Sequence, residues 1–258
     1  MALLLALVSG LCLAAGWEEQ LASARASLAA QERAGTPVET DCGLEGVRVV
    51  SEEAETAAMA CDGAGRALRF MGERGFKPPK PVTIRIAGRF PARYTEAKNP
   101  DGSPKYHLED VYGFYETDTS EVFMKTFAEF SKLPPDSMAM GMAPTRELYA
   151  SYVAHEVAHH VSLLGYRGQG KMPRVQTEFL SYVAQMETLA PTVREELLRR
   201  FKAAGGGSID SAGQIGELIY SMDPQGFMIK SWVFFKGPEG AKTLDDIMNG
   251  RLAEPVTF

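Results

Sequence analysis

Histidine is scarce in this chain, and its scarcity limits the chemistry that the chain can perform. The 258 residues include four histidines, three cysteines and two tryptophans. Basic residues are also in the minority, since 27 Lys and Arg stand against 33 Asp and Glu, for a net charge of -6. This balance argues against nucleic acid or an anionic membrane surface as the main partner. Any histidine-based site must be built from His107, His155, His159 and His160.

Long apolar runs are also missing, apart from residues 1–16, which read MALLLALVSGLCLAAG. This stretch is too short to span a bilayer core of roughly 30 Å. Ala14 and Gly16 supply the small residues of a signal-peptidase site, so we expect a signal peptide and an exported protein, periplasmic or secreted, without a stable membrane span. The first basic residue is Arg25, so the positive start of a signal is absent. The alternatives are a buried N-terminal helix or a misassigned start codon.

Signal removal would leave two cysteines, Cys42 and Cys61, an even number for an oxidising compartment. Residues 46–50 predict a short strand, and a helix from 52 to 74 is expected to follow with Ser51 as its N-cap. If the chain reverses at Ser51, the strand and the helix rise by similar lengths, which brings the sulfur atoms of Cys42 and Cys61 to the same height. We therefore predict a disulfide, with two buried thiols as the alternative.

The patterns along the chain change from strands to helices. We expect a leader arm or linker over residues 17–41 and a single domain over 42–258, strand-bearing in 42–130 and helical in 144–258. This order predicts an α+β fold, in which a small mixed β-sheet packs its edge hairpin on a long helix. The expected strands are 46–50, 82–87, 111–116 and 121–127, and the expected helices are 52–74, 145–164, 173–189, 192–202, 212–221 and 224–235.

The expected helix over 145–164 carries the motif HExxH, as His155-Glu156-Val157-Ala158-His159. Residues four apart share a helix face, so both imidazoles can bind one metal ion. Glu156 lies beside them, placed to hold a water molecule rather than the metal. The motif predicts one Zn²⁺, and histidines with no role in metal binding are the alternative interpretation.

A catalytic zinc site needs three protein ligands and an open position. The third ligand must be His107, His160 or a carboxylate. His160 turns about 100° away from His159 on the helix, so it cannot reach the same ion. Glu178 is the best candidate, because it lies on the next expected helix, eighteen residues after the motif, and the loop between them permits a helix hairpin.

An HExxH motif followed by a glutamate on the next helix resembles the gluzincins, the thermolysin-like and aminopeptidase-like zinc metallopeptidases. The resemblance covers roughly residues 111–185. It implies a metallopeptidase-like domain with His155, His159 and Glu178 as zinc ligands and Glu156 as the base that polarises the attacking water. It also implies that the hairpin edge binds an extended peptide or protein substrate.

The sequence departs from this family at the residue that orients a zinc histidine. Thermolysin-like enzymes have an aspartate four residues after the ligand glutamate, whereas this chain has Tyr182, with Ser181 and Gln185 nearby. A peptidase also needs a donor for the developing oxyanion. The candidates are Tyr220, Tyr182, His107 and Arg174, and Tyr220 is the one we assign to catalysis.

The sequence therefore predicts zinc-dependent hydrolysis of peptide bonds, in which Glu156 takes a proton from the water as it attacks. Two alternatives stay open. One is a silent metallopeptidase-like domain that binds a peptide or protein, because the usual aspartate is missing. The other is a zinc hydrolase that acts on a non-peptide bond, which the motif alone does not distinguish from a peptidase.

Overall fold

The computed structural model describes residues 37–106, 108, 111–134 and 137–252, and the described residues from Val38 onward form one compact unit. The expected signal peptide, nearly all of the expected leader arm and His107 lie outside the described residues. Within the described ranges, no helix has the length and apolar character needed to cross a bilayer.

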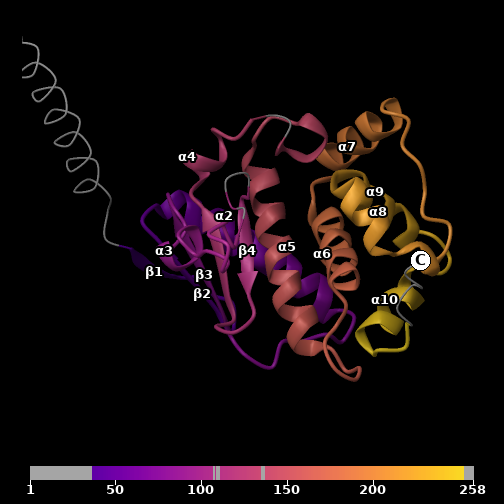
Figure 1. Cartoon of the computed structure of the whole chain (residues 1–258), viewed down its shortest axis with the longest axis horizontal. Helices are drawn as coiled ribbons and strands as arrows, with labels where there is room; N and C mark the ends of the chain where they lie inside the picture. Colours follow the sequence, from indigo (N-terminus) through magenta and orange to yellow (C-terminus); the bar gives the residue numbers. More distant parts are fainter. Residues whose placement is uncertain (1–36, 107, 109–110, 135–136, 253–258) are drawn as a thin grey trace, which may run out of the picture. The chain divides into compact units, whose positions relative to one another are not determined.

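The unit is built on a mixed sheet of five strands in the order β1-β2-β3-β5-β4 (Figure 1). β2 and β3 are parallel, as are β3 and β5, whereas β1 and β4 run antiparallel to their neighbours at the two edges. The expected hairpin is present as β4 and β5. The strands are β1 (Val38–Asp41), β2 (Val47–Ser51), β3 (Val82–Ala87), β4 (Gly113–Glu116) and β5 (Glu121–Lys125).

The two faces of the sheet are covered differently because side chains alternate along each strand. Val122 and Met124 of β5 point into the main core with the long helices, whereas Phe123 joins a second cluster with Phe90 and Tyr94. That second cluster belongs to the segment between β3 and β4, which contains the short helix α3 (Ala92–Thr95). Phe90 and α3 therefore cover this face of the sheet at β5.

Helix α2 (Ala54–Gly72) connects the parallel strands β2 and β3. The sequence predicted Ser51 as its N-cap, and this prediction is wrong. Ser51 is the last residue of β2, and Glu53 occupies the cap position without a side-chain cap bond. The hydroxyl of Ser51 instead accepts a hydrogen bond from the backbone N–H of Glu53 at 3.0 Å, which closes a tight turn between strand and helix.

The C-terminal half is helical, which confirms the expected α+β class. α5 (Arg146–Gly165) lies between the sheet and α6 (Arg174–Thr188), and α9 (Pro224–Phe235) packs on the other side of α6 (Figure 1). The remaining elements are α4 (Phe127–Phe130), η2 (Ala139–Gly141), α7 (Pro191–Ala203), η3 (Ala212–Gln214), α8 (Glu217–Met222) and α10 (Gly240–Met248). The expected elements include no counterpart of β1, α3, α4, η2 or α10.

The predicted disulfide is present between Cys42 and Cys61, with Cα atoms 5.3 Å apart. It ties the turn after β1 to the middle of α2. Since disulfides persist in oxidising surroundings, this bond indicates such an environment for the folded chain.

α2 crosses α5 closely at Gly63, and this contact gives a test of how the two helices pack. A Cβ atom at Gly63 would lie 2.2 Å from the carbonyl oxygen of Ala150, a backbone atom that cannot move aside. We expect Gly63→Ala to lower the free energy of unfolding by about 3 kcal/mol, measured by urea denaturation. Gly72→Ala on the same helix is the matched control, because it points into open space and should change stability by less than about 1 kcal/mol. Equal effects of the two variants would contradict this packing.

Candidate metal centre

The HExxH motif lies in the middle of α5, a helix whose residues are mostly buried. Thr145 is its N-cap and accepts a hydrogen bond from the backbone N–H of Leu148 at 3.1 Å. Val153, Val157 and Val161 are fully buried and fix the side of the helix that faces the core. This packing sets the rotation of α5, and the motif histidines consequently turn toward α6.

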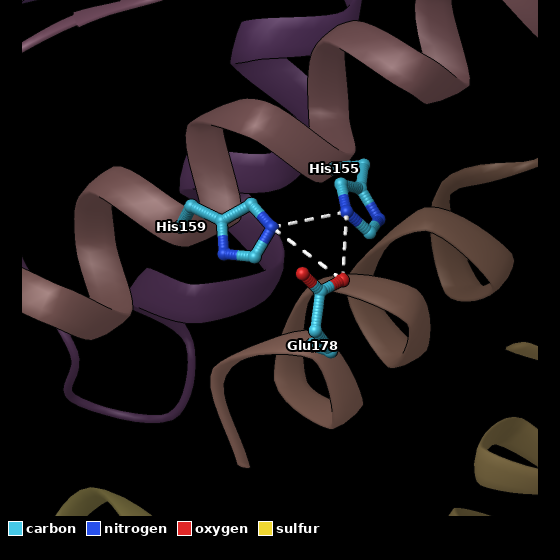
Figure 2. Close-up of side chains that lie close together, drawn as sticks. All are labelled: His155, His159 and Glu178. Carbon is cyan, nitrogen blue, oxygen red and sulfur yellow. Dashed lines mark hydrogen bonds and ion pairs between the residues drawn. The ribbon is translucent and has the colours of Figure 1, made fainter. Parts of the chain in front are cut away.

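His155 and His159 of α5 and Glu178 of α6 point toward one another (Figure 2). The Nε2 atoms of the histidines are 3.0 Å apart, and Oε2 of Glu178 lies 3.5 Å from that of His155 and 3.8 Å from that of His159. Three ligand atoms around a tetrahedral zinc ion are spaced about 3.3 Å apart. A point about 2.0 Å from all three atoms exists within this triangle, which is the length of a zinc bond to nitrogen or oxygen. The donor set and its spacing therefore fit one metal ion.

The charge states of His159 and Glu178 also suit a metal. Burial lowers the pKa of His159 to about 4, so its imidazole is neutral at pH 7. Burial works against ionisation of Glu178, but the neighbouring His159, His155 and Arg174 outweigh it and hold the pKa of the carboxyl well below its usual value. A neutral imidazole and an ionised carboxylate are the forms that bind metal.

Thr177 orients the ring of His159. Its hydroxyl oxygen lies 2.9 Å from Nδ1 of His159 and 3.0 Å from the hydroxyl of Ser162, which in turn donates to the carbonyl of His159. When Nδ1 donates to Thr177, Nε2 keeps its lone pair for a metal. All three residues are buried.

Removing this hydroxyl should weaken metal binding. We expect Thr177→Val, which keeps the shape of the side chain, to reduce zinc affinity about 10- to 100-fold, because the tautomer and orientation of His159 are no longer fixed. The measurement is competition with a chromogenic chelator. Thr177→Ser retains the hydroxyl and should bind zinc within a few-fold of the parent; a similar loss in both variants would contradict the role of the hydroxyl.

Gln185 lies beside His155, as Thr177 lies beside His159. Its amide nitrogen donates to Ser151 at 3.3 Å, which turns Oε1 the other way. Nδ1 of His155 and Oε1 of Gln185 are both buried without a hydrogen-bond partner. Burial opposes the charge of His155, but Glu178 first, then Glu156 and least Gln185 outweigh it and raise the pKa of this imidazole. The proton that Nδ1 carries when Nε2 binds a metal would give the amide oxygen its donor. Tyr182 contacts the same imidazole through its ring, with centroids 4.6 Å apart.

Glu156 faces the edge strand β4. The backbone N–H of Tyr115 donates to its carboxylate, and burial raises the pKa of Glu156 to about 7. The Tyr115 hydroxyl lies 3.2 Å from Nδ1 of His160, whose Nε2 lies 3.0 Å from the carbonyl of Lys80. Since that carbonyl accepts only, His160 donates from Nε2 and accepts from Tyr115. His160 thus does not face the metal group, and it ties β4 to α5 beside Glu156.

Tyr220 and Arg174 lie on the side of the centre formed by α6 and α8. A guanidinium nitrogen of Arg174 is 3.4 Å from the Tyr220 hydroxyl, and another is 3.3 Å from Glu217. Burial, with the charge of Glu178, raises the pKa of Tyr220 to about 12, so the phenol keeps its proton. The ring of Tyr220 also packs against Tyr182, with centroids 6.5 Å apart.

The structure thus gathers most of the residues that the sequence selected: His155, Glu156, His159, Glu178, Tyr182, Tyr220 and Arg174. Thr177 and Tyr115 were missed, although Thr177 directly precedes the candidate ligand. Gln185 was noted only for its place on the helix. A hydroxyl residue next to a predicted ligand is a usable signal, whereas the contact from Tyr115 depends on the sheet.

Comparison with known proteins gives a family but no activity. No curated protein and no solved structure matches the chain. A family model described as "Family of unknown function (DUF6639)" matches residues 47–255, which include both helices of the metal centre. The match covers most of the chain, and the protein therefore belongs to the DUF6639 family.

Proposed function

We propose that this protein is a zinc-dependent peptidase of the gluzincin type. The observation that carries the proposal is the convergence of His155, His159 and Glu178 on one point. Glu156 lies next to this triangle of ligand atoms but is not part of it. A protein that only binds a metal has no need of this fourth side chain, a half-buried carboxylate. Its burial has a cost, because a charged group loses its hydration inside a protein.

His155, His159 and Glu178 would hold the ion, which when bound supplies Lewis-acid polarisation and a lowered pKa for water. Glu156 would take a proton from the attacking water and return it to the leaving amine. Its pKa of about 7 lies near neutral pH, where a group can both accept and donate a proton. Tyr220 keeps its phenolic proton and can donate a hydrogen bond to the oxyanion.

The free edge of β4 supports a peptide as the substrate. Among the described residues, no strand pairs with its outer side. The carbonyl of Tyr112 accepts from Lys125 of β5, so Gly113 and Tyr115 turn their backbone groups away from the sheet. An extended peptide could add to this edge by main-chain hydrogen bonds to Gly113 and to the carbonyl of Tyr115, whose N–H already donates to Glu156. Such a strand would pass beside Glu156, which already contacts Tyr115.

Export completes the proposal. The Cys42–Cys61 disulfide suits an oxidising compartment, and the apolar residues 1–16 have the composition of a secretory signal. We propose that the enzyme acts on peptides or proteins in the periplasm or outside the cell.

The proposal is tested by metal content and activity measured together. The purified protein should contain one zinc per chain and should cleave casein or a random peptide library. A chelator should abolish cleavage, and added zinc should restore it. Cleavage that resists chelation would contradict the proposal. Stoichiometric zinc without any cleavage would favour the silent binding domain or a non-peptide substrate.

A further inference from the structure

Arg174 differs from most of the arginines that form ion pairs in the described part of the chain, because its contacts are long; Arg93, 3.5 Å from Glu121, is similar in this respect. Arg66 and Arg199 each make hydrogen bonds of 2.6 to 2.7 Å to carboxylates. The polar contacts of Arg174 are longer, 3.3 Å to Glu217 and 3.4 Å to the Tyr220 hydroxyl, its guanidinium lies 5.0 Å from the centre of the Tyr220 ring, and its side chain is 67% exposed. The guanidinium is therefore held in place from one side, while donors remain available on the other.

Its position is set by α6. Arg174 lies four residues before Glu178, so both side chains project from the same face of the helix. The Tyr220 hydroxyl is shared between them, since it contacts Arg174 and also interacts with Glu178. Because one hydroxyl contacts both groups, the nearest guanidinium nitrogen lies no more than about 6 Å from the carboxylate of Glu178. Two residues of an extended peptide span about that distance.

We propose that Arg174 is the binding residue for a substrate carboxylate that lies within about two residues of the scissile bond. This inference rests on the peptidase function proposed above and narrows its substrates to peptides with a negative charge at that place. Arg174 binds and does not take part in the chemical step.

The chemistry of the site favours a carboxylate. A guanidinium presents paired N–H groups that match the two oxygens of a carboxylate, and such pairs are stronger than neutral hydrogen bonds. Glu217 contacts one nitrogen of the Arg174 guanidinium. Because the Glu217 side chain is 43% exposed and this contact is long, a substrate carboxylate can replace it. The carboxylate has two possible sources, the C-terminus of a short peptide or the side chain of Asp or Glu.

The test uses the zinc-loaded Glu156→Gln protein, so that binding is measured without turnover. The probes are three peptides: N-acetyl-tetra-alanine as the free acid, the same peptide as its amide, and that amide with glutamate as its third residue. Titration calorimetry should show at least one charged peptide binding about tenfold or more tightly than the neutral amide. The tighter charged peptide identifies the C-terminus or the side chain as the source.

Arg174→Gln in the same background should bring all three affinities together. Arg167→Gln is the matched control, because Arg167 also makes only 3.4 Å contacts, to Asn249 and to the carbonyl of Gly75, and it should leave the preference intact. Equal binding of the three peptides before Arg174 is changed would overturn the proposal, as would a preference that survives Arg174→Gln. The peptidase function is decided separately, by chelator-sensitive cleavage of the parent protein.

Discussion

Glu156→Gln should leave one zinc bound to the protein and reduce kcat for peptide cleavage by about 10³-fold or more. The amide has the shape of the carboxylate but cannot accept the proton of the attacking water, and general-base catalysis contributes typically 10²- to 10⁴-fold. Since Glu156 is not one of the three converging side chains, the metal centre should stay intact. The measurements are metal analysis and steady-state cleavage of a fluorogenic peptide.

The folded protein should tolerate this change well. Burial raises the pKa of Glu156 to about 7, which means that the protein already opposes its charge. A neutral glutamine loses no charge stabilisation and can still accept the hydrogen bond from the backbone of Tyr115. We therefore expect the metal-free variant to match or exceed the thermal stability of the metal-free parent. Glu195→Gln, at an exposed position of α7, is the control and should retain full activity. Cleavage retained in Glu156→Gln would exclude this residue as the base.

Much of the candidate centre could be predicted because its spacing is local. HExxH places two imidazoles on one helix face by helix geometry alone, and the shortage of histidine directs the search for a third ligand to a carboxylate. Glu178 follows on the next helix, and a short loop between two helices favours antiparallel packing. The confirmed disulfide and hairpin also depend on neighbouring elements.

The residues that orient the centre could not be predicted in the same way, because their contacts join distant parts of the chain. The hydrogen bond of His160 to Lys80 spans 80 residues, and its contact with Tyr115 spans 45. β1 was missed since it is an exposed edge strand without an apolar pattern. The prediction that Ser51 caps the helix is wrong for a similar reason. Ser51 pairs with the distant residue Ile86, and this pairing extends β2 by one residue.

Glu178→Ala should have the largest effect on the metal itself. Loss of a partner outside the ligand set costs about 10- to 100-fold in affinity, and loss of a direct, charged ligand should cost on the order of 10³-fold. Two imidazoles would remain, with no negative charge in the triangle to offset the dication. The variant should therefore be purified with far less than one zinc per chain.

A thermal measurement checks the same result independently. A metal that binds only the folded state raises the melting temperature, so zinc should stabilise the parent and not Glu178→Ala. Glu187→Gln is the matched control on α6, since Glu187 contacts Trp232 and Lys236 away from the triangle and should leave the zinc response unchanged. Stoichiometric zinc in Glu178→Ala, with an unchanged thermal shift, would show that another residue completes the site. In that case Glu178 would not be the third ligand. The resemblance to gluzincins, which depends on a ligand glutamate after HExxH, would then not hold.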